Sequence, residues 1–181
     1  MKKFIFIGLL ICSFIIAGCD TVNNVKPPAQ GTDKNPVSAP AVKEKLSFLV
    51  YRPADDGSEK LLAENIIMED NGKSLPENAL LTLLSTKPKA AGMTSNIPDG
   101  TRLLQLQIKD GLATADFSRE IAKKGQGSHD ELMLVYSIVN TLTEFKEIKK
   151  VRFLVEGQQV ITFSGHMDLE DPLQRNETLL K

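Results

Sequence analysis

The segment Ser164-Gly165-His166-Met167-Asp168 places a hydroxyl, an imidazole and a carboxylate within five residues. Side chains of these types form hydrolytic triads and ligate metals. Triad members normally come from separate segments, because so short a spacing rarely gives the required geometry, and two ligands do not make a zinc site. The pattern therefore favours a turn cluster near the C-terminus over catalysis or metal binding.

Two further side chains could take part in acid–base chemistry. Asp116 ends an expected strand, where an acid more often caps the following turn through backbone hydrogen bonds than acts as a base. His129 lies in the first turn of an expected helix, where the helix dipole disfavours its charged form. The sequence contains no nucleophile elbow, phosphate loop or zinc motif. We therefore predict a chain that is not an enzyme, with no catalytic residue, cofactor or metal.

The cysteine at position 19 has a more specific context. A basic start at Lys2 and Lys3 precedes an apolar run, Phe4–Ile16, which is shorter than the roughly 20 residues that a membrane-spanning helix needs. The run ends in Ala17-Gly18-Cys19, which resembles the bacterial lipobox. That resemblance implies a signal peptide over 1–18, cleavage between Gly18 and Cys19, and lipid on Cys19. The alternative is a plain signal peptide or signal anchor with an incidental cysteine.

The predicted lipid would hold the protein on the extracytoplasmic face of the cell membrane. Cys12 would be removed with the signal, so the mature chain has one thiol and no intramolecular disulfide. Residues 19–45 then form a flexible tether, because they are polar and contain four prolines, Pro27, Pro28, Pro36 and Pro40.

Composition excludes some classes of partner. Loss of Lys2 and Lys3 with the signal would leave 20 basic residues against 23 acidic ones, so the basic footprint of a nucleic-acid-binding protein is missing. The chain has no Trp and only 6% aromatic residues, which also disfavours a stacking platform for bases or sugars.

The first half of the remaining chain predicts two strands and a helix. The strands are expected over 46–51 and 60–69, separated by a turn-rich segment that includes Asp56-Gly57. Ser74 and Glu77 have the spacing of a capping box, Pro76 suits a first helical turn, and Lys87-Pro88 ends the helix.

The second half predicts a hairpin, a longer helix and a last strand. Alternating residues over 101–109 and the strand 112–117 flank Asp110-Gly111, whose residue types favour a tight hairpin turn. Ser128 and Glu131 form a second potential capping box, opening a helix with apolar residues at helical spacing. A strand follows at 151–155, and residues 158–163 are a candidate short strand.

This order of elements predicts an α+β domain over 46–173, with a polar, frayed tail at 174–181. Two helices cannot sandwich so few strands without exposing apolar surface. We therefore expect a single mixed β-sheet with both helices packed on one face.

Several segments resemble the GerMN domain. They are Ile97-Pro98-Asp99-Gly100-Thr101-Arg102-Leu103-Leu104, the hairpin 110–118, the helix segment 139–144, the strand 151–158, and the segments 164–169 and 171–173. The resemblance implies a fold similar to the ring-building motif of secretion-system and sporulation-channel proteins, with two extra N-terminal strands. It also implies a secreted or lipid-anchored envelope protein of sporulation, spore germination or envelope assembly, with no established enzymatic activity.

Three functional classes follow from these observations. The first is a membrane-anchored assembly module that binds envelope proteins. The second is an accessory module that binds a wall-derived ligand such as peptidoglycan, through a peptide added to an exposed strand. The third is a wall hydrolase, for which the sequence offers only the side chains discussed above.

Overall fold

The computed structural model describes residues 44–123 and 127–181. The expected signal peptide 1–18, its cleavage site at Gly18 and Cys19, and almost all of the tether 19–45 lie outside the described residues. The described residues belong to one compact unit of the chain.

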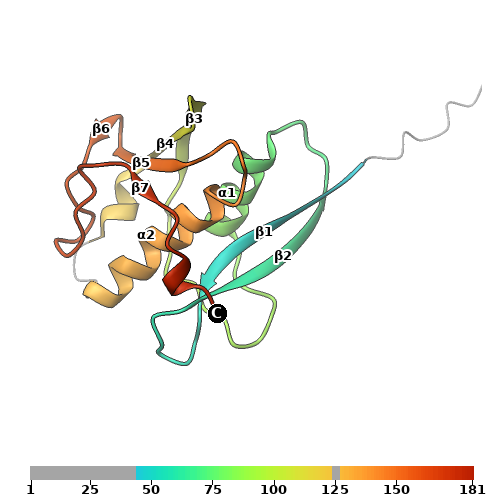
Figure 1. Cartoon of the computed structure of the whole chain (residues 1–181), viewed down its shortest axis with the longest axis horizontal. Coiled ribbons are helices and arrows are strands. Elements are labelled where there is room, and N and C mark those ends of the chain that lie inside the picture. Colours follow the sequence, from blue (N-terminus) through green and yellow to red (C-terminus); the bar gives the residue numbers. More distant parts are fainter. Residues whose placement is uncertain (1–43, 124–126) are drawn as a thin grey trace, which may run out of the picture. The chain divides into compact units, whose positions relative to one another are not determined.

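The N-terminal strands β1 (Lys45–Pro53) and β2 (Leu61–Glu69) pair antiparallel along their whole length. They form a two-stranded sheet of their own instead of joining the other strands (Figure 1). The prediction of one sheet was wrong in this respect. The backbone on the other edge of β1 forms hydrogen bonds with groups outside any strand. Thr141 Oγ1 accepts from the Tyr51 amide at 2.9 Å, and the Pro53 carbonyl accepts from the Thr94 amide at 2.8 Å.

Helix α1 (Leu75–Ser85) begins as its sequence predicts. The Ser74 Oγ accepts a hydrogen bond from the Glu77 amide at 3.3 Å, and Pro76 lies in the first turn. The Glu77 side chain instead pairs with Lys73, so one half of the capping box is present. The helix ends before Lys87-Pro88, where proline restricts the preceding backbone.

Strands β3 (Leu103–Lys109) and β4 (Leu112–Phe117) form the predicted hairpin. Asp110 has a φ of 52° and Gly111 a φ of 82°, which are the two positive values that a tight turn of this kind requires. Every second residue of β4 enters the core, namely Ala113, Ala115 and Phe117.

After a short 3-10 helix, η1 (Arg119–Ala122), helix α2 (Ser128–Leu142) leads to β5 (Lys150–Val155), which runs parallel to β4. Two short strands then pair antiparallel with β5, β6 (Gln158–Gln159) and β7 (Leu173–Gln174). The larger sheet is therefore mixed, and its strand path is β3-β4-β5-β6 with β7 also on β5.

Both helices pack against the two sheets. They contact β1, and in addition α1 contacts β3 and α2 contacts β5 (Figure 1). Val139 and Phe153 are buried as predicted, and the Phe153 ring packs against Phe117 at 6.2 Å and edge-on against Phe163 at 5.3 Å. The α+β class and the two helices are thus confirmed.

The segment 174–181 does not fray, contrary to the prediction. Arg175 Nη2 donates to the Tyr51 hydroxyl at 2.7 Å, and its guanidinium lies over the Tyr51 ring at 4.9 Å. Asn140 exchanges hydrogen bonds with the Asn176 backbone, and the short helix η2 (Glu177–Leu179) buries Leu179. The terminal residues therefore complete the fold against β1 and α2.

Candidate functional site

The segment 164–168 follows β6 and meets the start of α2. The loop donates five hydrogen bonds to the buried Glu131 carboxylate, at 2.7–3.0 Å. The donors are the Thr162 and Ser164 hydroxyls and the amides of Phe163, Ser164 and His166. The Ser164 hydroxyl thus donates to a carboxylate.

Glu131 has an unusually low pKa. Burial alone would raise the pKa, but the hydrogen bonds from Ser164, Thr162 and His166 outweigh it and lower the pKa from 4.5 to about 2. The second predicted capping box was wrong, because α2 has Gly127 as its N-cap with no side-chain hydrogen bond. The Glu131 carboxylate accepts hydrogen bonds from residues 162–166 and does not cap its own helix.

The other acids of interest also bind backbone amides. Asp116 Oδ1 accepts from the Gly157 amide at 3.0 Å, and so caps the turn after the neighbouring strand β5 and not a turn after its own. Asp168 Oδ1 accepts from the Glu170 amide at 2.9 Å within its own loop. Both carboxylates therefore stabilise turns in this structure.

His129 lies on the outer side of the first turn of α2. Its Nδ1 is 4.0 Å from the Glu59 carboxylate, and both side chains are partly exposed. Within residues 44–123 and 127–181, no three His, Cys, Asp or Glu side chains are grouped so that they could hold a metal ion.

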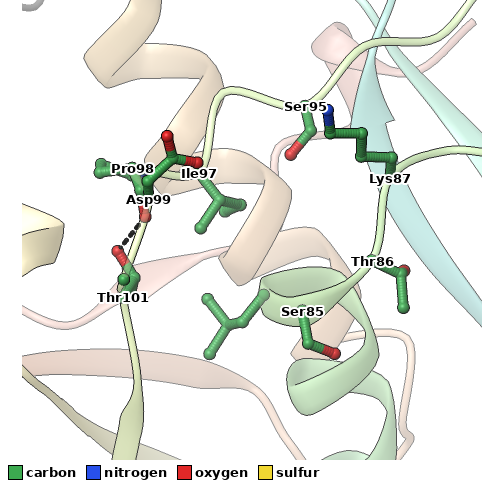
Figure 2. Close-up of a pocket in the computed structure, with 10 residues that line it drawn as sticks. Ser85, Thr86, Lys87, Ser95, Ile97, Pro98, Asp99 and Thr101 are labelled. Atoms are coloured by element: carbon green, nitrogen blue, oxygen red, sulfur yellow. Dashed lines mark hydrogen bonds between the residues drawn. The ribbon is translucent and has the colours of Figure 1, made fainter.

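A hollow of about 360 Å³ lies between the C-terminal end of α1 and the loop that precedes β3 (Figure 2). Its wall includes Thr86, Lys87, Ser95, Ile97, Asp99 and Thr101. The Thr101 hydroxyl donates to the Pro98 carbonyl at 2.7 Å, which closes the loop on itself. Ile97 to Thr101 belong to one of the motifs that resemble the GerMN domain, but no local pattern indicated that α1 would meet them.

This hollow suits binding better than catalysis. Figure 2 shows hydroxyls at its edge, the Lys87 ammonium on one side and the Asp99 carboxylate on another. Lys87 follows the last turn of α1, where the helix dipole favours a cation. A small polar group that carries an amine or a carboxylate fits this lining.

The described residues contain no helix that is both long and apolar enough to cross a membrane.

Comparison with known proteins relates this chain to a family. The family model described as "Germane: Sporulation and spore germination" matches residues 49–161. The spore germination protein GerM of Bacillus subtilis (strain 168) is 26% identical to the chain, over 93% of the chain and 53% of GerM. The chain thus spans about half the length of this curated relative.

Solved structures give the same result. The tandem GerMN domains of GerM from Bacillus subtilis share 25% identity at a TM-score of 0.62, over 72% of this chain and 46% of theirs. The first GerMN domain of that protein shares 26% identity at a TM-score of 0.61, over 72% of this chain and 98% of its own length. The resemblance to the GerMN domain is therefore confirmed, and the chain belongs to the Germane family of sporulation and spore germination domains.

Proposed function

We propose that this protein is a lipid-anchored, extracytoplasmic assembly module, which binds envelope proteins in sporulation, spore germination or envelope assembly. The observation that carries this proposal is the family match over residues 49–161, together with the similarity to a spore germination protein over most of the chain.

The geometry supports a role in binding over one in catalysis. Ser164 and the His166 amide are engaged by Glu131, and Asp116 is engaged by the Gly157 amide. A nucleophile needs a base within hydrogen-bond reach and a third group that orients the base. The Ser164 hydroxyl and the Asp116 and Asp168 carboxylates instead hold loops in place.

The anchor rests on the sequence Ala17-Gly18-Cys19 after an apolar run. Cys19→Ser should abolish incorporation of labelled fatty acid and release the protein from membranes or stall its processing. Cys12→Ser is the matched control, since it removes the other thiol but should leave labelling intact. Equal fractionation of wild type and Cys19→Ser, with no lipid on either, would contradict the anchor.

Partner binding is tested in a sporulating host. Crosslinking and pull-down from intact cells should capture envelope proteins with the wild-type chain. The double variant His166→Ala/Asp168→Ala should still complement a deletion strain, provided that it folds, because these side chains do no chemistry in this proposal. Soluble products released from purified wall by the wild type, and lost in this variant, would instead indicate a wall hydrolase.

The hollow at the end of α1 favours one alternative, an accessory module that binds a wall-derived peptide. Its lysine, carboxylate and hydroxyls match the amine and carboxylate groups of such a ligand. Soluble wall peptides should then perturb Lys87 and Thr101 in NMR titrations, and Lys87→Gln should weaken binding while Lys89→Gln should not.

A further inference from the structure

One face of the larger sheet points away from the core. Paired residues on neighbouring strands share a face, and the buried residues of β4 and β5 fill the opposite one. The outward residues, which we call the open face, are Gln105, Gln107 and Lys109 on β3, Leu112, Thr114 and Asp116 on β4, and Lys150, Arg152 and Leu154 on β5.

Arg152 stands out on this face. It is half-buried, its Nε is fully covered, and the described residues offer its side chain neither a hydrogen bond nor an ion pair. The other described arginines, Arg52, Arg102, Arg119 and Arg175, each form an ion pair. The covered Nε lies out of reach of a partner. The two terminal nitrogens of the guanidinium are not among the covered atoms and have no acceptor among the described residues, so they can donate to a carboxylate of another molecule.

The open face is also positively charged in a chain whose formal net charge is −1. Lys109 and Lys150 are exposed, and within the described residues neither forms an ion pair. Asp116 is the acid of this face, and its Oδ1 already accepts from the Gly157 amide. Three cations of the open face therefore stand against two acids, Asp116 on the face and Asp110 at its hairpin turn.

The spacing of these cations matches an extended peptide. Lys150 and Arg152 are two residues apart on β5, which places them about 7 Å apart along the strand. Alternate side chains of an extended peptide repeat at the same distance. Lys109 on β3 pairs with Leu112 on β4, and Leu112 pairs with Lys150 on β5. Lys109 is therefore two strands from Lys150, which is roughly 10 Å across the sheet.

A hollow of about 400 Å³ lies on this face beside the hairpin turn. Its lining comprises Gln107, Lys109, Asp110, Leu112 and Thr114. An amide and a hydroxyl can bond the backbone of a peptide, and Leu112 offers an apolar contact. The open face carries no aromatic ring on which a sugar could stack.

We propose that the open face binds an extended acidic segment of a partner protein. Carboxylates at alternate positions of that segment meet Arg152 and Lys150, and a further carboxylate meets Lys109. This inference rests on the proposed function, since it names the chemistry of the partner that the assembly module takes.

The test uses the purified full chain in detergent and a fluorescein-labelled eight-residue Glu-Thr repeat as the probe, followed by fluorescence anisotropy. The Gln-Thr repeat should not bind. Arg152→Gln should weaken binding of the Glu-Thr repeat at least tenfold, because the guanidinium makes the central contact. Lys89→Gln, which changes net charge equally in the loop after α1, should leave affinity unchanged.

A second variant guards against loss of folding by Arg152→Gln. Lys109→Gln/Lys150→Gln alters two exposed side chains and should also weaken binding at least tenfold. Equal weakening by Arg152→Gln and Lys89→Gln, equal binding of both repeats, or tighter binding of polyphosphate than of the Glu-Thr repeat would overturn the proposal. The crosslinking experiment above does not use this probe. Retained partner capture by both open-face variants would therefore refute the open-face site alone.

Discussion

At the scale of single residues, Glu131 shows how a carboxylate can be structural while its neighbours look catalytic. It lies at zero exposure and accepts five hydrogen bonds from residues 162–166. The hydroxyls and glycine of that loop indicated a turn. The carboxylate that accepts the loop's hydrogen bonds, however, lies more than 30 residues away in sequence. Local spacing could not reveal that partner, because the pairing depends on how α2 packs.

Glu131 should make the free energy of unfolding of the domain depend on pH. Its folded pKa of about 2 is below the ordinary 4.5, so the carboxylate stabilises the fold fully above about pH 4.5 and loses this contribution as pH falls towards 2. The contribution is about 3 kcal/mol. Glu131→Gln should lower the free energy of unfolding by about 2–4 kcal/mol at pH 7 and flatten its decline between pH 5 and 2.

Urea unfolding at several pH values measures this effect. Glu77→Gln is the control, because the Glu77 carboxylate is partly exposed and its loss should change stability by less than about 1 kcal/mol. A Glu131→Gln variant with the stability and pH dependence of the wild type would show that the loop does not rely on the carboxylate.

At the scale of elements, a buried ion pair joins β1 to β2, and its arginine also binds the C-cap of α1. Arg52 Nε donates to Glu64 Oε2 at 2.5 Å, and the guanidinium also donates to the Thr86 carbonyl and hydroxyl. Burial alone would raise the pKa of Glu64. Hydrogen bonds from the Lys89 amide and Arg52 outweigh burial, so the pKa is lowered. This cluster fixes the end of α1, and hence one wall of the hollow in Figure 2.

Breaking one half of this pair should cost more than removing both halves. Arg52→Met leaves a buried carboxylate without its cation and should lower the free energy of unfolding by about 3–5 kcal/mol. Arg52→Met/Glu64→Leu should recover most of that loss. Chemical denaturation of the three proteins measures it, with Arg119→Met in an exposed pair as the control. A double variant as unstable as Arg52→Met would contradict the argument.

The element scale is also where the sequence was most informative. The start of α1, the Asp110-Gly111 turn and the strands on either side follow from local chemistry, and the structure has them. The separation of β1 and β2 from the larger sheet does not follow from local chemistry. It depends on which distant groups form hydrogen bonds with the outer edge of β1. The docking of 174–181 was missed for a similar reason, because Tyr51 and Asn140 are remote in sequence.

At the scale of the whole molecule, residues 41–181 contain the entire described core and neither cysteine of the chain. A fragment of these residues should therefore unfold in one cooperative transition that is the same with and without reductant. Coincident fluorescence and circular-dichroism transitions would confirm this. Within it, Phe153→Ala should cost about 3–5 kcal/mol, because the ring is buried between two others. Transitions that differ between the two probes would contradict a single core.

The contact between the two ends of this domain has a consequence for synthesis. The Leu61 carbonyl accepts from the Lys181 amide, and Arg175 binds Tyr51 of the first strand. The ribosome releases residues in order, so β1 and β2 wait for these partners until residues 175–181 have been synthesised. Until then the nascent domain lacks its complete native contacts. Such a delay would suit a protein whose proposed N-terminal signal is recognised before folding is complete.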